Sequence, residues 1–399
     1  MPSPSFLAMR QRNAICILQA VRKNPGLSRA QVAIDCTLAK STVSSIVEDL
    51  LKTGVLLEQS WQVSSRAGRR PVGLTFNPEA RVSIGISLDS DRIDTVISNL
   101  DGKLLKVRRK SLAPGQTRTL TEESLTAAVV AELEAILKAR NLNAQRVAGL
   151  GLAAPGPIST SESTSIRGRQ FNLATLSQSL CKKLDFQCRP LLDSNTNMAA
   201  LAENRLGAAK HSEDALVVRL GTEIRSALLV NHRLLRGTKG LAGGIGHIVV
   251  PDNNIICSCG KTGCINSIAA ADSIVSLCQN SGAAVDSIDD VIELALAGER
   301  NCCLVLEEAA TAIGFGIASA INIVAPSSLI ITGQLLDALD VVSVPLTASL
   351  KKYCTVENLQ NCNVIFSNSE KHSEAVGASL APVLQEDFLV NLVRTGDSP

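Results

Sequence analysis

Two stretches of the chain, 130 positions apart, carry the same order of short apolar strands and tight turns. Residues 82–105 predict three strands in a meander, with the second turn at residues 101–102. Residues 215–235 repeat the pattern, and residues 231–232 stand at the equivalent turn. A duplicated strand meander that is followed by helices predicts an α/β body of two lobes around a cleft.

Segments with helical periodicity follow each meander, because their apolar residues recur every three or four positions. They are residues 120–139 in the first lobe, and residues 199–209, 270–280, 288–298 and 304–323 in the second. The predicted domains are residues 1–76 as an N-terminal domain, residues 77–197 with a C-terminal helix at 374–399 as the first lobe, and residues 198–373 as the second lobe.

The charge of the chain is divided unevenly between its N-terminal segment and the rest. Residues 1–76 hold ten Lys and Arg and four acids, a net charge of +6, whereas the remainder carries −4 and the whole chain +2. A basic head on a mildly acidic body indicates a nucleic-acid module joined to another domain. Only 2% of the residues are aromatic. This argues against a protein that binds RNA or single-stranded DNA by stacking bases on aromatic side chains.

The basic head has the pattern of a winged helix-turn-helix. Three short amphipathic helices are predicted, separated by a Pro-Gly stop and by a tight turn. Two strands at residues 55–57 and 72–76 would form the wing. The alternative is an ordinary three-helix bundle with a polar surface. The predicted helices cover residues 14–23 with Asn13 as the cap, residues 28–36 with a capping box at Ser28, and residues 40–53.

Short polar side chains and one cation crowd the first turn of the third predicted helix. Such side chains can meet phosphates and base edges when a helix N-terminus enters the major groove of double-stranded DNA. Arginines in the loop between the wing strands can enter a narrow minor groove, although a basic loop alone is usually a solvated linker. The predicted DNA contacts are Arg29, Lys40, Ser41, Thr42, Ser44, Ser45, Arg66, Arg69 and Arg70.

One histidine and three cysteines stand close together in the second half of the chain: His247, Cys257, Cys259 and Cys264. This is the composition of a closed structural zinc site, in which four ligands surround the ion. The alternative is four unrelated buried residues in a chain with twelve cysteines. We expect the other cysteines in the core and not in disulfides, because the chain shows no secretion signal and a cytoplasmic location is expected.

Four further motifs extend over nearly the whole chain. They are Gly-Arg-Arg-Pro at residues 68–71, Gly-Leu-Gly-Leu-Ala-Ala-Pro-Gly-Pro at 149–157, Asn-Met-Ala-Ala-Leu-Ala-Glu at 197–203 and Leu-Ala-Gly-Gly-Ile-Gly-His at 241–247. Together with Cys-Ser-Cys-Gly-Lys-Thr-Gly-Cys at 257–264, they resemble the ROK family, in its branch of N-acetylglucosamine and xylose repressors. The resemblance implies a two-lobed actin-like (ribonuclease H-like) ATPase or sugar-kinase fold for the body, a structural zinc ion (Zn²⁺) and a homodimer or homotetramer.

The positions that carry kinase chemistry in this family are altered. Family kinases have Asp-x-Gly-Gly-Thr at the first phosphate turn, where this chain has Ser-Leu-Asp-Ser-Asp at 87–91. The second turn, Gly-Thr-Gly-x-Gly in kinases, is Gly-Thr-Glu-Ile-Arg at 221–225, and a third Gly-rich turn is Thr-Gly-Gln at 332–334. The family's general base, an Asp, corresponds to Asn195. An amide cannot accept the proton of a sugar hydroxyl, so the resemblance implies a regulator that is not an enzyme.

The two glutamates with which family members hold a sugar correspond to Gly244 and Asn266. A cleft that contains Ser194, Asn195, Asn266 and His247 can still bind a polar effector, such as a sugar or a sugar phosphate. Three alternatives stay open. The body can serve only as an oligomerisation scaffold, a protein partner can control it in place of a sugar, or the chain can be an active glucose or N-acetylglucosamine kinase.

The sequence therefore predicts a cytoplasmic transcriptional repressor with no membrane part. Because dimeric helix-turn-helix proteins mirror the two-fold symmetry of DNA, we expect a pseudo-palindromic operator. A ligand in the cleft would change lobe closure, and with it the spacing of the heads, provided that it binds the two states with different affinity.

Overall fold

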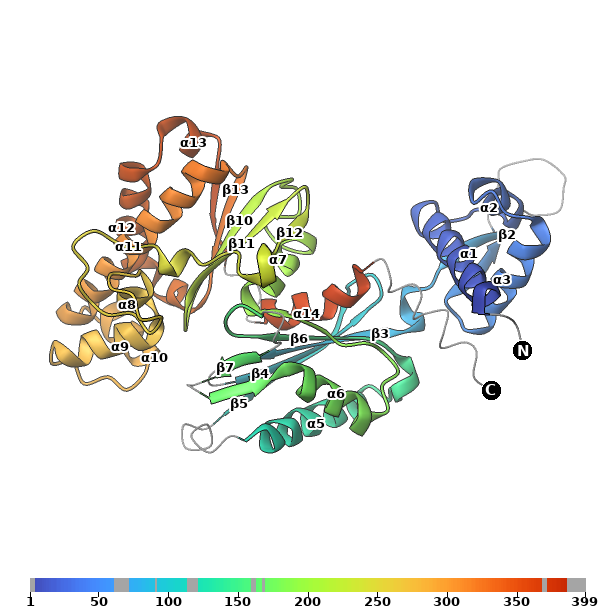
Figure 1. Cartoon of the computed structure of the whole chain (residues 1–399), viewed down its shortest axis with the longest axis horizontal. Coiled ribbons are helices and arrows are strands. Elements are labelled where there is room, and N and C mark those ends of the chain that lie inside the picture. Colours follow the sequence, from blue (N-terminus) through green and yellow to red (C-terminus); the bar gives the residue numbers. More distant parts are fainter. Residues whose placement is uncertain are drawn as a thin grey trace.

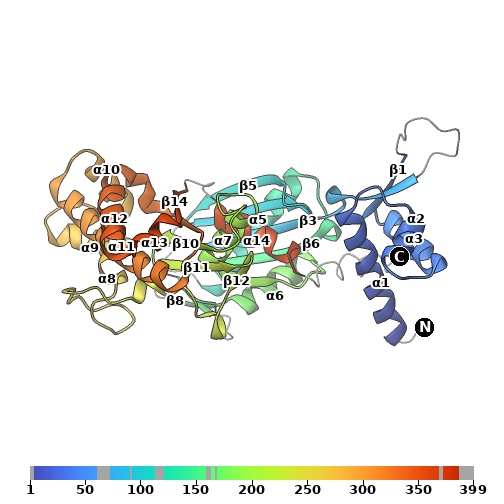
Figure 2. The same cartoon turned by 90° about the horizontal axis from the view of Figure 1, so that it is seen from above.

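The computed structural model of the chain describes residues 4–60, 72–89, 92–112, 121–158, 163–166, 169–367 and 372–385. They form three parts in a row (Figures 1 and 2): an N-terminal head at one end, a first α/β lobe in the middle and a second α/β lobe at the other end. The predicted α/β fold with an N-terminal helix-turn-helix is confirmed.

The head contains three helices and a two-stranded antiparallel sheet. Ser28 caps the second helix by accepting a hydrogen bond from the backbone N–H of Gln31 at 3.2 Å. This is one half of the predicted capping box; the side chain of Gln31 donates to Asp35 Oδ1 at 2.9 Å and not back to Ser28. The predicted cap at Asn13 is wrong, because the first helix begins at Pro4 and the apolar pattern marked only its packed part. The elements are α1 (Pro4–Lys23), α2 (Arg29–Asp35), α3 (Lys40–Lys52), β1 (Leu56–Ser60) and β2 (Val72–Phe76).

The first lobe is a five-stranded sheet in the order β5–β4–β3–β6–β9. The predicted meander forms one edge, and β3, β6 and β9 run parallel. Figure 1 shows α5 and α6 on one face of this sheet and α14 on the other. The strands are β3 (Val82–Leu88), β4 (Arg92–Asn99), β5 (Leu104–Ser111), β6 (Val147–Ala154) and β9 (Leu191–Ser194), with a separate ribbon of β7 (Ser163–Ile166) and β8 (Arg169–Asn172). The helices are α5 (Glu122–Ala139), α6 (Leu173–Leu184), α7 (Asn195–Arg205) and α14 (Ser373–Val383).

The second lobe repeats this strand order as β12–β11–β10–β13–β14, which confirms the duplication. Its meander is followed by two strands that run parallel to β10. The strands are β10 (Ala215–Leu220), β11 (Ile224–Val230), β12 (Arg233–Leu235), β13 (Ser328–Thr332) and β14 (Asn363–Phe366). The helices are α8 (Asn266–Ala269), α9 (Ala271–Asn280), α10 (Ile288–Leu296), α11 (Arg300–Val324), α12 (Leu339–Tyr353) and α13 (Val356–Gln360).

Helix α14 lies directly against the sheet of the first lobe because glycines leave room for it. A Cβ atom at Gly85 or at Gly151 would collide with the carbonyl oxygen of Ala375 or of Ala378. The C-terminal helix expected over 374–399 ends at Val383, and residues 386–399 lie outside the described residues.

The apolar core of the head continues into the first lobe. Leu100, Ala148 and Val383 of the lobe are buried in one cluster with the packed faces of α1, α2 and α3. The head therefore packs directly against the end of the first lobe through a shared apolar interface.

Among the described residues, one helix is long and apolar enough to cross a membrane by length and composition, namely α11. In the structure 56% of its apolar window is buried, and its buried side chains belong to the core of the second lobe. We interpret α11 as a core helix.

Candidate DNA interface and metal centre

The N-terminal half of α3 presents the predicted polar residues on the outside of the head. Lys40, Ser41 and Ser45 are exposed, and Thr42 and Ser44 are half-buried. The opposite face of α3 is buried in the head and consists of Val43, Ile46, Val47 and Leu50. This second helix of a helix-turn-helix is the one that enters the major groove in DNA-binding domains, with its N-terminal residues toward the bases.

Two acids in the C-terminal half of α3 and one in β1 are paired with arginines of the other two helices. Arg10 forms an ion pair with Asp49. Arg29 lies 3.8 Å from Glu48 and donates from Nε and Nη2 to Glu58 Oε1 at 3.1 and 2.8 Å. Exposed pairs of this kind add only about 0–1 kcal/mol to stability, but they offset the repulsion between carboxylates and DNA phosphates. The DNA contact of Arg29 stays a prediction, since Glu58 already engages its guanidinium group.

The predicted contacts in the wing, Arg66, Arg69 and Arg70, lie outside the described residues. Strands β1 and β2 pair from Leu56 opposite Phe76 to Ser60 opposite Val72. Ser60 and Val72, which flank the segment with the three arginines in the sequence, are therefore paired at one end of the hairpin.

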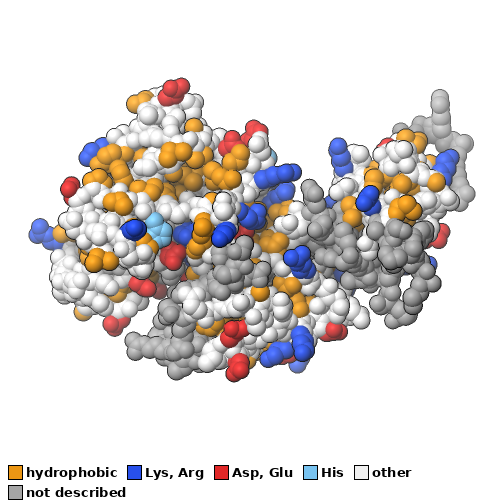
Figure 3. Space-filling model, viewed as in Figure 1, with side chains coloured by type: hydrophobic (Ala, Val, Ile, Leu, Met, Phe, Trp, Pro, Cys, Tyr) orange, Lys and Arg blue, Asp and Glu red, His pale blue; other side chains and the backbone are white. Residues whose placement is uncertain are grey.

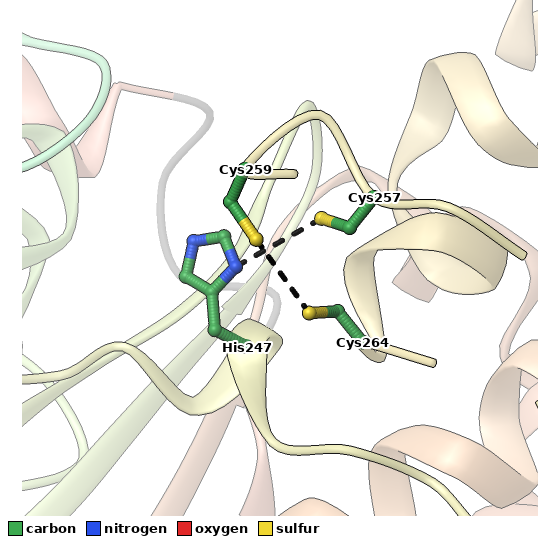
Figure 4. A group of neighbouring side chains, drawn as sticks. All are labelled: His247, Cys257, Cys259 and Cys264. Atoms are coloured by element: carbon green, nitrogen blue, oxygen red, sulfur yellow. Dashed lines mark hydrogen bonds between the residues drawn. The ribbon is translucent and has the colours of Figure 1, made fainter. Parts of the chain in front are cut away.

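Four potential ligand atoms converge in the second lobe (Figure 4). The ligand atoms of His247, Cys257, Cys259 and Cys264 all lie within 4.8 Å of one another. Cys257 Sγ is 3.9 Å from His247 Nδ1, and Cys259 Sγ is 3.7 Å from Cys264 Sγ. Tetrahedral ligands with bonds of about 2.0–2.3 Å to a zinc ion are roughly 3.3–3.8 Å apart. The predicted cluster therefore forms, and the two sulfur distances of 3.9 and 3.7 Å lie close to this range.

The loop that carries Cys257 and Cys259 turns sharply to bring its thiols back toward Cys264. Gly260 and Gly263 have φ angles of +85° and +86°, which residues with a side chain rarely adopt. Burial, and then the neighbouring thiols, raise the pKa of Cys264 to about 12. Three ionised thiols at this distance repel one another unless a cation lies among them, and metal binding would release their protons.

Two of the predicted effector residues, Ser194 and Asn195, are buried and make internal hydrogen bonds. Ser194 caps α7 by accepting from the backbone N–H of Asn197 at 3.2 Å. Asn195 Nδ2 donates to the carbonyl oxygen of Leu88 at 3.0 Å, and the hydroxyl of Ser87 donates to Asn195 Oδ1 at 3.3 Å. The two hydrogen bonds of Asn195 connect the start of α7 with the end of β3.

The other two predicted effector residues also have structural contacts. Asn266 is buried, and its Oδ1 accepts from the backbone N–H of Ile224 at 2.8 Å. His247 faces the cysteine cluster. The assignment of an effector to these positions stays a prediction.

Among the residues that the structure describes, ion pairs connect the two lobes at two places. Arg219 on β10 donates from Nη2 to Asp89 Oδ2 at 2.8 Å and from Nε to Glu374 Oε1 at 2.7 Å. All three side chains are at least nine-tenths buried. The second place lies between the edge strands of the two sheets. Arg236, directly after β12, donates from Nε to Oδ2 of Asp193 on β9 at 2.8 Å. Pattern analysis missed Arg219, although a lone arginine in the apolar strand β10 is a signal for a buried ion pair.

The sequence profile of the ROK family matches residues 83–383 of the chain. The chain belongs to the ROK family. The matched range spans both sheets and the cysteine cluster of this ROK protein, whereas its head lies before the matched range.

Named relatives match almost the full length of this ROK chain. The xylose repressor of Bacillus spizizenii is 26% identical over 387 residues, which are 96% of this chain and 97% of the relative. The Escherichia coli K12 protein called DNA-binding transcriptional dual regulator NagC is 26% identical over 386 residues, 93% of this chain and 92% of that protein. The similarity therefore includes the head.

Solved ROK structures share the fold. A ROK family transcriptional regulator described as a homologue of the E. coli MLC protein superposes with a TM-score of 0.76 at 19% identity, over 97% of this chain and 99% of that one. A ROK glucokinase from Streptomyces griseus, in complex with glucose and AMPPNP, gives a TM-score of 0.60 at 22% identity over 75% of this chain and 98% of the kinase. The glucokinase therefore aligns with a smaller part of this chain, 75%, than the transcriptional regulator, which aligns with 97%.

Proposed function

We propose that this ROK protein is a DNA-binding transcriptional regulator whose kinase-like body does not phosphorylate sugars. The observation that carries the proposal is the exposed, polar N-terminal half of α3 in a helix-turn-helix that is packed onto a ROK body. The names of the relatives support it, because xylose repressor and transcriptional dual regulator describe proteins that match this chain from the head to the second lobe.

The proposed loss of kinase activity follows from the hydrogen bonds and ion pairs that the altered positions form. Asn195 stands where the family has its general base, and both ends of its amide are hydrogen-bonded to Ser87 and Leu88. Asp89, in the first former phosphate turn, and Arg219, just before the second, are bound to each other. The described part of the site therefore offers neither a proton acceptor for a sugar hydroxyl nor an open backbone cradle for phosphates.

On DNA, the two groups of predicted contacts would have different roles. Ser41, Ser44 and Ser45 would reach base edges in the major groove, whereas Lys40 would meet a phosphate. Arg69 and its neighbours in the wing would enter the minor groove. The first group would set sequence preference and the second would add affinity that depends on salt.

The test is fluorescence anisotropy with labelled DNA from upstream of the protein's own gene. We expect specific binding by the native chain and at least tenfold weaker binding when Ser41 and Ser45 are both changed to Ala. Ser276→Ala on α9 is the matched control, since Ser276 is an exposed helical serine far along the chain in the second lobe. Absence of specific binding by the native protein, or ATP-dependent phosphorylation of glucose or N-acetylglucosamine, would contradict the proposal.

We also propose that His247, Cys257, Cys259 and Cys264 bind one structural Zn²⁺. Elemental analysis of the purified protein tests this directly, with one zinc per chain as the expected result. Cys259→Ser should remove the metal, and Cys303→Ser, which changes a half-buried cysteine outside the cluster, should retain it.

We propose that the protein acts as a symmetric oligomer, so that two heads meet two half-sites. Figure 3 shows apolar side chains gathered on the second lobe. Ile323, Val344 and Val356 of this lobe are 85%, 72% and 71% exposed, and exposed apolar surface is a common contact between subunits. Analytical ultracentrifugation should show a dimer or tetramer, and a monomer at micromolar concentration would contradict this.

A sugar effector would have to displace the internal hydrogen bonds of Asn195 and Asn266. We therefore expect neutral hexoses to leave the melting temperature unchanged at millimolar concentration. A thermal-shift screen of sugars and sugar phosphates measures this, and a clear rise in melting temperature would assign an effector.

A further inference from the structure

The buried ion triad of Arg219, Asp89 and Glu374 spans the boundary between the lobes. Arg219 belongs to the second lobe, and the two carboxylates belong to the first. Its side chain is 8% exposed, and those of Asp89 and Glu374 are 4% and 10% exposed. Burial opposes the charged form, but the two carboxylates raise the pKa of the Arg219 guanidinium above its ordinary value. The Arg219 guanidinium therefore keeps its charge although it is buried.

The guanidinium group of Arg219 also lies against the second former phosphate turn. A Cβ atom added to Gly221, the first residue of that turn, would be 2.9 Å from Arg219 Nη1. Asp89 is the first residue after β3, at the first former phosphate turn. A cation of the chain itself thus bridges the two turns that face each other across the lobes.

Further ion pairs anchor the carboxylate end of the contact within the first lobe. Arg92 lies 3.5 Å from Asp89 and 3.6 Å from Asp94. Arg109 in turn holds Asp94 with two hydrogen bonds of 2.7 and 2.8 Å. Asp89 is therefore held at the end of β3 by its contacts with Arg92 of β4.

Helix α14 links this contact to the head. Glu374 stands in its first turn, where the positive end of the helix dipole favours a carboxylate. At the other end of the same helix, Val383 is buried in the core that holds α1, α2 and α3. Because α14 is packed tightly onto the sheet at Gly85 and Gly151, the head, α14 and the first lobe form one packed unit.

We propose that Arg219, held by Asp89 and Glu374, is a built-in latch that keeps the two lobes closed without a nucleotide and thereby fixes the position of the DNA-reading head relative to the second lobe. The proposal rests on the proposed DNA-binding function for its consequence at the head. Opening the latch changes the angle between the lobes, and so the distance between the two heads of an oligomer that is joined through its second lobes.

The test compares Arg219→Gln with Arg225→Gln in the full-length protein. Arg225 lies directly opposite Arg219 on the neighbouring strand and is buried to the same degree, but its Nη2 donates to Ala242 within the second lobe. Hydrogen exchange of the backbone amides at the end of β3 and the start of α14 reports opening between the lobes. Operator binding by anisotropy reports the head.

We expect Arg219→Gln to speed exchange at both segments at least fivefold and to weaken operator binding at least tenfold, while Arg225→Gln changes neither. Arg219→Lys, which keeps the charge but has one nitrogen to share between two carboxylates, should give an intermediate result. Glu374→Gln should resemble Arg219→Gln, and the double variant should be no worse than either single one.

Unchanged exchange in Arg219→Gln, or unchanged operator affinity together with faster exchange, would overturn the latch. If the native protein binds no operator, the proposed function fails, and the exchange measurement still decides whether Arg219 holds the lobes together.

Discussion

Arg22 in α1 donates a hydrogen bond to the backbone carbonyl oxygen of Leu100 at 3.1 Å. It thereby ties the first helix of the head to the turn between β4 and β5. The same guanidinium group stacks over the ring of Phe76, 5.1 Å from its centroid. Together with the shared apolar core, this contact makes the head and the first lobe one structural unit.

Val383→Ala should destabilise the head and the first lobe together. Val383 is 7% exposed in the core that both share, so its truncation should cost about 1.5–2.5 kcal/mol of unfolding free energy. Val230→Ala, at a site that is 38% exposed, should cost about 1 kcal/mol or less. Urea unfolding, monitored by hydrogen exchange of the backbone amides, measures the unfolding free energy of both variants. A head that unfolds in its own transition, with the first lobe unaffected, would show that the shared core does not couple them.

Lys40→Ala should weaken DNA binding without regard to sequence. Lys40 is exposed at the start of α3, and Lys52 is exposed at its end. Loss of one phosphate contact should reduce the slope of log affinity against log salt by about 1. The measurement is anisotropy at several salt concentrations, with Lys52→Ala as the control on the same helix. Equal effects of the two changes would argue against α3 entering DNA by its N-terminal end.

Removal of metal should lower the stability of the second lobe. The cluster closes the loop between η4 (Ile245–His247) and α8, and structural zinc contributes directly to folding. We expect a chelator to lower the melting temperature by several degrees, and added Zn²⁺ to restore it. Cys259→Ser should have the low melting temperature already and should not respond to either reagent. A native protein that is indifferent to the chelator would argue against a structural metal.

Asp94→Asn should destabilise the protein at neutral pH and less so in acid. Burial raises the pKa of the Asp94 carboxyl, but hydrogen bonds from Arg109 and His372 outweigh burial and hold the pKa below its ordinary value. A carboxylate with a lowered pKa stabilises the fold above its unfolded pKa of about 3.9, and this contribution is lost as the pH falls below that value. We expect a loss of about 2–3 kcal/mol at pH 7, less than for a fully buried pair because Arg109 is 32% exposed.

Urea midpoints of native protein and Asp94→Asn, measured from pH 7 to pH 3.5, test this sign. The gap between the two curves should narrow below about pH 4. A constant gap would mean that the Asp94 charge contributes nothing and that only the shape of the side chain matters.

Local patterns predicted most of the fold. The meander at residues 82–105 and its repeat at 215–235 appear as β3–β5 and β10–β12, because strand alternation and turn residues act over a few positions. The helix predicted at 199–209 begins earlier, at Asn195, since Ser194 caps it. The start of α1 at Pro4 was missed because the apolar pattern used to place the helix begins only at Ala14.

The cysteine cluster was predictable for the same reason, since His247 and Cys264 lie within one short stretch of chain whose glycines allow a compact loop. The roles of Ser194, Asn195 and Asn266 were not. Residue type alone shows that each can bind a polar ligand, whereas only the packed structure shows that Leu88, Ile224 and other neighbours already occupy their polar atoms.

The secondary structure, the duplication, the basic head and the histidine-cysteine cluster could be read from the sequence, because each depends on residues that are near one another along the chain. The contacts of Arg219 with Asp89 and Glu374, which lie 130 and 155 positions away, could be found only in the folded chain. The same holds for Val383, which completes the core of the head. Such contacts form when separate elements dock, and a buried charge has to find a partner among whatever residues the docking brings near it.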